Sequence, residues 1–374
     1  MTSSNRKPRV AVVFGGVSSE HSISCISAGS VLKAIDPEKY DVVPIGISTT
    51  GEWVLENPET NQLALGPAGE MPNVVGDREV TLTHGERTSL ELRDGGGAAP
   101  GEGLGDIDVV FPVMHGPFGQ DGTLQGLLEM VGVRYVGAGV LSSAVGTDKA
   151  FMKLLFEAQD LPVLPYVVVT PREWARDETG ARDRIAELGF PVFVKPARAG
   201  SSFGISRVNS ADDLDAALEE ARRFDPKVIV EAAAIGAREV ECGVLQGEGN
   251  EPHLTSELGE IRIDAHHQFY DLEAKYLPEE NTALDVPAEM EPELADRIKS
   301  YAVRAFEALG VEGLARVDFF VFDDGRIVLN EVETMPGFTN LSMFPRMWAA
   351  SGVDYPELVD RLIRLALDRP LGLR

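Results

Sequence analysis

Four charged side chains between residues 314 and 333 have the types and spacing to act on a phosphate. Two runs rich in Val, Ile and Phe flank the dipeptide at 324–325, an Asp-Gly pair that predicts a two-residue hairpin loop. That register places Asp318 opposite Glu331 and Arg316 opposite Glu333, all on one face, because strand side chains alternate. Deeper in the hairpin, the same face would carry Phe320, Leu329, Phe322 and Ile327.

Two carboxylates directly opposite one another in a sheet need a counter-charge. Magnesium would serve, since it takes oxygen ligands, is held by one or two carboxylates and is completed by water and substrate phosphates. Arg316 would then face the anion that the metal also faces. The alternative is a solvated hairpin end, where an exposed Arg316–Glu333 pair is worth less than roughly 1 kcal/mol.

Glycine-rich turns follow two buried strands in the N-terminal half. The apolar run 10–14 ends in a Gly-Gly turn and a helix that reaches residue 32, and the run 109–113 leads into the glycine-punctuated loop 115–122. Loops at the carboxyl ends of strands in open α/β sheets are where ligands bind. By spacing alone, Glu20 is a favourable anion at a helix N-terminus and His21 a surface residue.

A small-residue loop, PARAGSSFG at residues 196–204, lies between predicted strands at 192–195 and 205–208. Such a loop can fold over phosphates with its backbone N–H groups, with Lys195 as the charge at its base. Lys149 begins a predicted helix whose apolar residues are at helical spacing. Those apolar residues are Phe151, Leu154, Leu155 and Ala158.

Composition limits the classes of function. The 374 residues allow two or three domains, and 44% hydrophobic content supports packed cores. A net charge of −26 argues against nucleic acid or an anionic membrane as partner. Cys25 and Cys242 have no metal-ligand spacing and are expected to be buried. With no signal-like or membrane-spanning segment, we expect a cytoplasmic protein. Residues 57–104 predict an irregular insertion with one short hairpin.

Several ordered motifs together carry a resemblance to a known family. They are VFGGVSSEHSIS, HGPFGQDGTLQG, VGTDKAFMK, FVKPARAGSSFGISRV, FYDLEAKYL, ARVDFF and NEVETMPGFTNLSMFP. With them the chain resembles the D-alanine–D-alanine ligases of the ATP-grasp superfamily, of the actinobacterial type, nearly end to end.

The resemblance implies an α/β fold of three domains with a Rossmann-like N-terminal open parallel sheet. Residues 1–142 would form that domain and hold the first D-alanine, 143–231 the central ATP-grasp domain, and 232–374 the C-terminal domain with the metal site and a lid loop. It also implies a homodimer. ATP would phosphorylate the carboxylate of one D-alanine, and the amine of the second would attack the acyl phosphate to give D-alanyl-D-alanine for peptidoglycan.

The resemblance also implies site residues. Lys149, Lys195, Glu231, Ala232 and Glu239 would bind ATP, and Asp318, Glu331 and Glu333 two Mg²⁺ ions, with Mn²⁺ as a substitute. Arg316 and the Gly337 N–H would receive the developing oxyanion. Glu20, Ser201 and Tyr276 would form one hydrogen-bonded set that closes the lid. His115, Lys275 and Ser342 would contact the D-alanine substrates.

Three positions depart from the family pattern. Glu333 stands where asparagine is usual, Gln120 where glutamate is usual, and Ala237 adds a residue shortly before Glu239. An added charge at about 4 Å counts for up to roughly 4 kcal/mol at an effective dielectric of 20, so metal affinity should tighten or ATP shift unless Arg316 absorbs the charge. We expect activity with altered metal dependence.

Two other functions are compatible with these residues. One is a D-alanine ligase with D-serine or D-lactate as second substrate, although a tyrosine at position 276 favours an amine nucleophile. The other is a nucleotide-binding homologue that lost catalysis through Glu333. A substrate panel would separate the first from a D-alanine–D-alanine ligase, and nucleotide binding without dipeptide formation would support the second.

Overall fold

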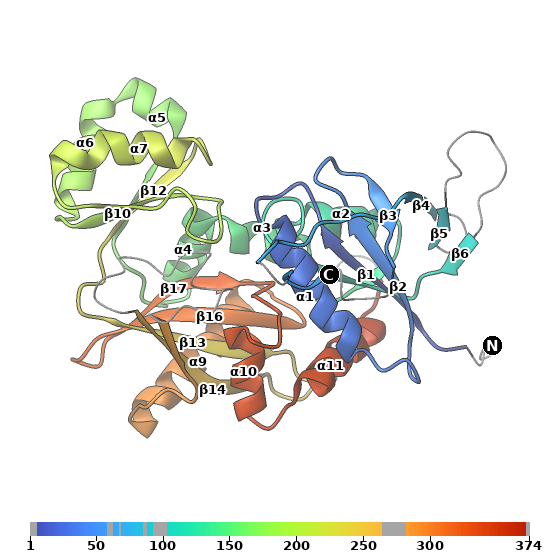
Figure 1. Cartoon of the computed structure of the whole chain (residues 1–374). Coiled ribbons are helices and arrows are strands. Elements are labelled where there is room, and N and C mark those ends of the chain that lie inside the picture. The colour runs from blue at the N-terminus through green and yellow to red at the C-terminus, as the bar shows by residue number, and fades with distance from the viewer. Residues whose placement is uncertain are drawn as a thin grey trace.

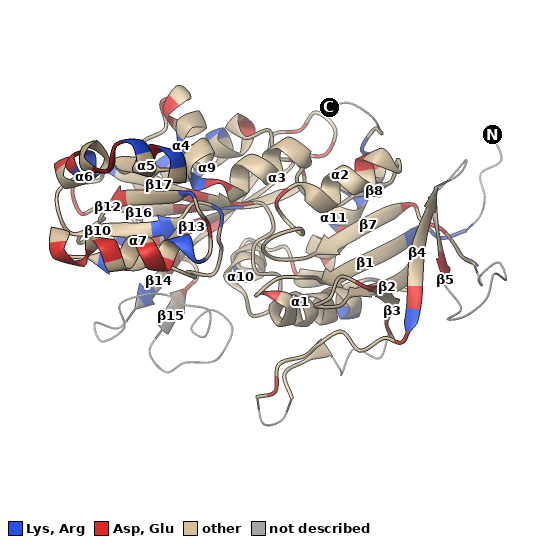
Figure 2. Ribbon diagram, turned by 90° about the horizontal axis from the view of Figure 1, so that it is seen from above, with Lys and Arg blue, Asp and Glu red and all other residues tan. Residues whose placement is uncertain are grey.

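The computed structural model describes residues 6–57, 63–66, 69–84, 88–92, 103–263 and 282–371. These residues form three β-sheets, of eight, four and five strands, which follow one another along the chain. The eight-stranded sheet lies to one side of the molecule and the other two lie one above the other on the opposite side (Figure 1). Seen from above, β1, β2 and β7 remain on one side and β10, β12, β16 and β17 on the other (Figure 2).

The first sheet has a parallel centre and an antiparallel extension. Strands β1, β2, β7 and β8 are parallel, and their apolar runs are buried because helices cover them. The predicted insertion is more ordered than one hairpin, since β4, β5 and β6 join β3 at the edge of this sheet. The elements are β1 (Arg9–Gly15), α1 (His21–Ala34), β2 (Asp41–Ile47), β3 (Trp53–Leu55), β4 (Arg78–His84), β5 (Thr88–Leu92), β6 (Gly103–Asp106), β7 (Val109–Val113), α2 (Thr123–Met130), β8 (Arg134–Tyr135) and α3 (Val140–Thr147).

The second sheet is small and antiparallel, in the order β11-β10-β12-β9. Its helix α7 packs apolar residues on β10 and β11. The predicted small-residue loop connects β10 to β11 and so lies at one edge of this sheet. The elements are β9 (Tyr166–Val169), α5 (Pro171–Arg176), α6 (Glu178–Glu187), β10 (Val192–Pro196), β11 (Ser206–Val208), α7 (Leu214–Arg222) and β12 (Val228–Ala232).

The third sheet, in the order β15-β14-β13-β16-β17, carries the predicted hairpin. One face packs on α4 and α9, and α10 packs on β13 and β14. The elements are α4 (Lys149–Ala158), β13 (Arg238–Leu245), β14 (Leu254–Ile263), β15 (Thr282–Asp285), α9 (Pro292–Ala308), β16 (Leu314–Val321), β17 (Ile327–Glu333), α10 (Met343–Ala350) and α11 (Tyr355–Asp368).

The hairpin β16–β17 confirms the register predicted at its polar end and corrects it at its apolar end. Asp318 pairs with Glu331, and Arg316 pairs with Glu333. The loop is longer than predicted, because Phe322 N–H bonds the Arg326 carbonyl. Its last residue is a glycine with a φ of 81°, the left-handed conformation that a three-residue hairpin loop requires.

A β-bulge restores the polar register that the longer loop would have shifted. The register changes between Asp318 and Phe319, where Asn330 is the extra residue on β17. Leu329 therefore pairs with Phe319 and lies in the core between the sheet and α4–α9, on the opposite face from Asp318. The prediction that Leu329 and Ile327 share the face of the carboxylates was wrong for this reason.

The apolar pattern assigned to α4 is also corrected. Phe151, Leu154 and Leu155 are 55%, 53% and 37% exposed. The buried face of α4 instead carries Ala150, Met152, Lys153 and Phe156. In the described residues, both cysteines are free and buried, as predicted, and no helix has the length and apolar character needed to cross a bilayer.

Candidate active site

A cavity of about 310 Å³ lies between the second and third sheets. The loop after β10 and the ends of β12, β13, β16 and β17 line it. Ten of the predicted site residues lie on its wall, which brings together segments as distant as α4 and β17. They are Lys149, Lys195, Ser201, Glu231, Ala232, Glu239, Arg316, Asp318, Glu331 and Glu333.

One end of the cavity is built on a lysine cluster, which we define as Lys153, Lys195 and Glu231. Lys195 donates to Glu231 Oε2 at 2.7 Å, and Lys153 Nζ lies 3.2 Å from Glu231 Oε1. Burial alone would raise the pKa of Glu231, but the two ammonium groups outweigh it and lower that pKa to about 2. Burial lowers the pKa of Lys153, whose side chain is fully enclosed.

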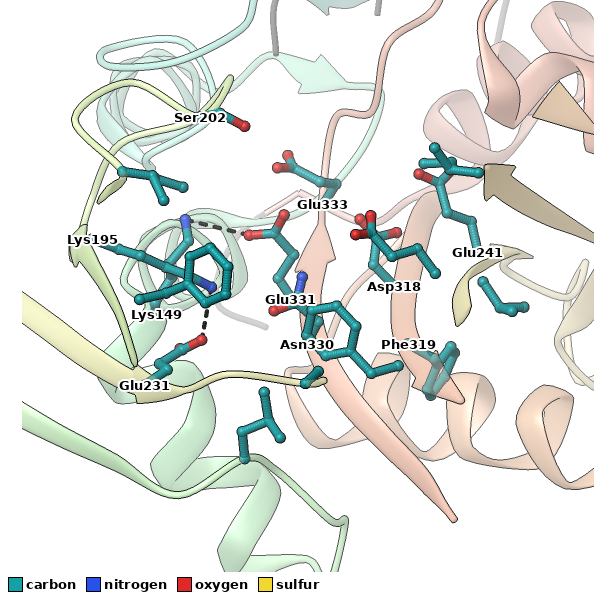
Figure 3. Close-up of a pocket in the computed structure, with 18 of the residues that line it drawn as sticks. Lys149, Lys195, Ser202, Glu231, Glu241, Asp318, Phe319, Asn330, Glu331 and Glu333 are labelled. Carbon is teal, nitrogen blue, oxygen red and sulfur yellow. Dashed lines mark hydrogen bonds and ion pairs between the residues drawn. The ribbon is translucent and has the colours of Figure 1, made fainter. Parts of the chain in front are cut away.

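Lys149 connects this end of the cavity to the other. The Asp148 carboxylate caps α4 by accepting from the N–H groups of Ala150 and Phe151, which fixes Lys149 at the helix start. Lys149 Nζ donates to the Ala199 carbonyl at 2.9 Å and lies 3.3 Å from Glu331 (Figure 3). Although burial lowers the pKa of Lys149, the charges of Glu331 and other carboxylates raise it above its usual value.

The other end holds a carboxylate cluster, which we define as Glu241, Asp318, Glu331 and Glu333. Arg316 makes two parallel hydrogen bonds to Asp318, of 2.8 and 2.7 Å, and lies 3.1 Å from Glu241. These carboxylates outweigh the effect of burial and raise the pKa of Arg316 well above its usual value. In Figure 3, Asp318 and Glu241 lie on the side of the cavity opposite Lys195 and Glu231.

Glu333, one of the three positions singled out in the sequence, has a hydrogen-bond partner in the structure. Its register neighbour Arg316 turns instead to Asp318 and Glu241. The Gln120 amide, from the loop after β7, donates to Glu333 Oε2 at 3.4 Å. Burial, and then the charge of Glu331, raise the pKa of Glu333 to about 7.

The chemistry of this end suits a divalent cation. The carboxylate cluster supplies only oxygen donors, the ligands that Mg²⁺ takes, and burial of its charges beside one another favours a cation. Among the residues that the structure describes, no three acidic or histidine side chains surround a common point. Arg316 holds Asp318, and Lys149 holds Glu331.

Glu20 and Ser201 meet at the edge of the cavity although 181 residues separate them. The Ser201 hydroxyl donates to Glu20 Oε1, and Ser201 has a φ of 49°. Gly116 lies so close that a Cβ there would be 2.5 Å from Glu20 Oε2. The glycine and the strained serine therefore let three distant segments converge on one carboxylate.

His115 is buried beside this carboxylate. Its Nδ1 lies 3.2 Å from the Met335 carbonyl and its Nε2 3.1 Å from the Ser27 hydroxyl, so the proton is on Nδ1 in the neutral ring. Burial lowers the pKa of His115, and the charge of Glu20 opposes that shift. His21, expected at the surface, is instead buried, with Nδ1 against the Gly16 carbonyl at 2.8 Å.

The remaining predicted residues lie outside the cavity wall or outside the described residues. Ser342 precedes α10, where its hydroxyl and the Thr339 hydroxyl are 2.8 Å apart. Gly337 is half-buried in the segment after β17. Lys275 and Tyr276 lie outside the residues that the structure describes, so the lid prediction stays a prediction.

Two charged residues of the lysine and carboxylate clusters were not predicted, and neither was Arg207 on the cavity wall. Lys153 is four residues after Lys149, a spacing that puts both ammonium groups on one face of α4. Glu241 is two residues after Glu239 and pairs across the sheet with Asp318. The i,i+4 spacing of Lys149 and Lys153 and the i,i+2 spacing of Glu239 and Glu241 can be read from the sequence. They identify site residues only once it is known which faces of α4 and β13 are buried.

The chain matches family models and relatives over nearly its full length. The model described as D-ala D-ala ligase N-terminus matches residues 9–138, and that described as D-ala D-ala ligase C-terminus matches residues 155–364. The D-alanine–D-alanine ligase of Kineococcus radiotolerans is 55% identical over 378 residues, covering 100% of both chains. That of Arthrobacter sp. (strain FB24) is 54% identical and covers 98% of this chain and 96% of its own.

Solved structures agree with the sequence matches. The VanG D-Ala:D-Ser ligase from Enterococcus faecalis has a TM-score of 0.80 and 34% identity, covering 96% of this chain and 100% of its own. The D-alanine–D-alanine ligase from Coxiella burnetii has a TM-score of 0.79 and 33% identity, covering 97% and 94%. The family matches, the three-sheet fold and the charged cavity agree, and the chain belongs to the D-alanine–D-alanine ligase family.

Proposed function

We propose that this protein joins two D-alanine molecules into D-alanyl-D-alanine at the expense of ATP, in the cytoplasm, as a precursor for peptidoglycan. One observation carries the proposal: a single cavity has lysines at one end and carboxylates at the other, with Arg316 beside the carboxylates. Lysine ammonium groups can neutralise an anionic polyphosphate, and carboxylates can bind the metal ions that accompany it. Relatives more than half identical to this chain are named for that reaction.

The lysine end of the cavity is suited to ATP. Lys149 and Lys195 would neutralise its phosphates, because their ammonium groups lie on the cavity wall. The Ala232 N–H donates to the Pro165 carbonyl at 3.0 Å, which ties the residue after Glu231 to the segment before β9. Glu231 and the backbone of Ala232 would hold adenine, and Glu239 the ribose.

The carboxylate end is suited to divalent cations. Asp318, Glu331 and Glu333 would hold two Mg²⁺ ions, for which Mn²⁺ can substitute. When bound, these ions neutralise charge on the transferring phosphoryl group. Arg316, which donates two hydrogen bonds to Asp318, would face the reacting phosphate from beside these carboxylates.

The reaction proceeds in two steps. A carboxylate oxygen of the first D-alanine takes the γ-phosphoryl group and ADP leaves, and then the amine of the second D-alanine attacks the acyl carbon. Phosphate leaves, the attacking nitrogen gives up a proton to solvent, and the peptide bond remains. Arg316 and the Gly337 N–H would stabilise the oxyanion, a task in which one donor is worth roughly 3 kcal/mol.

The D-alanine sites would lie at the junction of the first and third sheets. Glu20 would bind the amine of the first D-alanine, with His115 beside it, and Ser342 the carboxylate of the second. Ser201, Lys275 and Tyr276 would close over them and exclude water, which hydrolyses an acyl phosphate. The contact of Ser201 with Glu20 supports this arrangement.

A different second substrate is the alternative. The VanG structure is named a D-Ala:D-Ser ligase, but it is 34% identical to this chain, whereas relatives at 54% and 55% identity are named D-alanine–D-alanine ligases. The retained charges of the cavity disfavour a homologue without catalysis. D-alanine is therefore the preferred second substrate.

Domain boundaries and assembly are part of the proposal. The intervals 1–142, 143–231 and 232–374 are supported by the three sheets, whose strands span 9–135, 166–232 and 238–333. The helix α4, within the central interval, packs on the third sheet. A homodimer is supported by exposed apolar side chains on the consecutive, contacting helices α2, α3 and α4. These are Leu127, Met130, Val140, Leu141, Phe151, Leu154 and Leu155.

Phosphate release from MgATP, measured with and without D-alanine and with products identified by mass, tests the function. We expect D-alanine-dependent release with D-alanyl-D-alanine as product. Parallel assays with D-serine or D-lactate beside D-alanine should give little mixed product. ATP binding without D-alanine-dependent release would contradict the proposal.

A further inference from the structure

Gln120 and Glu333 form a contact between the first and third sheets at the carboxylate end of the cavity. Gln120 lies in the loop between β7 and α2, and Glu333 is the last residue of β17. The Gln120 Nε2 donates to Glu333 Oε2 at 3.4 Å, across 213 residues of sequence. In this contact the amide presents its NH₂ group and the carboxylate oxygen accepts.

The backbone around Gln120 is held in place. Its N–H donates to the Gly116 carbonyl at 3.2 Å, and its carbonyl accepts from the Thr147 hydroxyl at 3.1 Å. The preceding carbonyl, of Gly119, accepts from the Gln125 amide at 2.9 Å. The backbone of Gln120 is therefore already ordered, and only its side-chain rotamer has to be fixed on contact with Glu333.

The two cationic side chains near Glu333 form their hydrogen bonds and ion pairs with other groups. Arg316, its register neighbour, holds Asp318 and Glu241. Lys149 donates to the Ala199 carbonyl and pairs with Glu331. In the described part of the chain, Gln120 is therefore the hydrogen-bond partner that orients the Glu333 carboxylate.

We propose that Gln120 is a positioning residue for Glu333, and that the two side chains work as one acid–amide pair in which acid and amide can be exchanged. Glutamate and glutamine have the same length and differ only in the terminal group, so either position can carry the acid or the amide. Exchange keeps one negative charge and one hydrogen bond, whose direction reverses. This inference rests on the proposed function for the nature of the bound cation.

The test uses changes that preserve side-chain length. Gln120→Glu places two carboxylates in contact and drives Glu333 away, whereas Glu333→Gln places two amides in contact and removes one charge from the cation site. The combined variant exchanges acid and amide. Gln159→Glu is the matched control, because it makes the same chemical change at the exposed end of α4.

The primary measurement is the Mn²⁺ dissociation constant of the ADP complex, with dipeptide formation as second readout. Each single variant should weaken Mn²⁺ binding about tenfold, and the combined variant should lie within about threefold of the unmodified protein, as expected for contacting residues. The Gln159→Glu control should not change Mn²⁺ binding. A combined effect equal to the product of the two single effects would overturn the proposal.

A second variant covers the case in which Gln120→Glu does not fold. Gln120→Leu removes the donor without adding charge, and should weaken Mn²⁺ binding about threefold in the unmodified protein but not in the Glu333→Gln background. An equal effect in both backgrounds would also overturn the pairing. If the protein formed no dipeptide but the exchange restored Mn²⁺ binding, the proposed function would fail and the pairing would stand.

Discussion

The two ends of the cavity bury charge of opposite net sign. In the lysine cluster, two ammonium groups enclose one carboxylate, and Glu231 and Lys153 are both fully buried. In the carboxylate cluster, four carboxylates meet Arg316 and Lys149. The first end has excess positive charge and the second excess negative charge. Each excess is of the sign that a nucleotide with its metal ions would neutralise.

The two ends also differ in whether the folded protein itself stabilises the buried charge. Charge stabilised in this way supports folding, whereas charge that is not stabilised is available to a ligand. The shifted pKa of Glu231, about 2, means that the lysine cluster stabilises an ionised carboxylate without any ligand. Glu333, with a pKa raised to about 7, lacks such stabilisation. Buried ionisable groups that the fold itself does not compensate are typical of functional sites.

Arg316 should give the largest effect, because its partners are the buried Glu241 and the half-buried Asp318. Arg316→Met leaves Asp318 and Glu241 without their cation, so we expect a loss of about 3 kcal/mol in the free energy of unfolding. Dipeptide formation should fall about a hundredfold or more. Urea unfolding and steady-state rates measure the two effects. Arg316→Lys, which keeps charge without the paired hydrogen bonds, should recover stability more than rate; full recovery of both would contradict the role given to the guanidinium.

Glu231→Gln tests whether the lysine cluster contributes to folding. The folded pKa of about 2 lies below the ordinary value of 4.5, so the stability is present above pH 4.5 and is lost as pH falls toward 2. The variant should be about 3 kcal/mol less stable at pH 7, and this gap should narrow between pH 5 and 3. Urea unfolding across that range measures it. Glu178→Gln, at an exposed ion pair, is the control, and a gap independent of pH would count against the assignment.

Lys149 lies between the two ends of the cavity, so replacing it should change the charge at both. Lys149→Met removes the contacts with Ala199 and Glu331 and one charge facing the nucleotide. We expect the KM for MgATP to rise roughly tenfold or more, equivalent to about 1.4 kcal/mol per factor of ten. Lys227→Met, whose lysine pairs with Asp148 outside the cavity wall, is the control. An equal rise in KM for both variants would indicate a general effect on α4.

Ser201→Ala should give the smallest effect, since it removes one hydrogen bond to Glu20 and leaves both charged ends in place. A neutral donor to a charged acceptor is worth about 1.5 kcal/mol or somewhat more, which corresponds to roughly tenfold in rate. The KM for D-alanine should change and the KM for MgATP should not. Steady-state kinetics with each substrate varied in turn separates the two, and a change confined to MgATP would place Ser201 on the nucleotide instead.

Much of the site could be predicted from local pattern. Alternation along a strand determines which side chains share a face, so the hairpin pattern alone places Asp318, Glu331 and Glu333 together. The strand β7 has the predicted bounds, because a continuous apolar run between turn residues is a strong local signal. The family motifs added the predicted residues at the lysine end of the cavity.

Local pattern failed where two irregularities offset each other. The hairpin loop has three residues instead of two, and the bulge at Asn330 shifts the register back by one. The polar pairs were therefore predicted correctly, while Leu329 was assigned to the wrong face. A one-residue shift in register moves every side chain of a strand to the other face of the sheet. No residue type in this hairpin predicts the bulge.

The sequence by itself determined most of the elements, the shared face of Asp318, Glu331 and Glu333, and the family. Only the tertiary structure decided which charges are paired, because pairing depends on how α4, β13 and the loop after β7 pack around the hairpin. Arg316 bonds Asp318 and Glu241 instead of its register neighbour, Lys153 is enclosed beneath Glu231, and Gln120 reaches Glu333. Except for Arg316 with Asp318, these contacts join residues far apart in sequence, and side-chain periodicity carries information only along a single element.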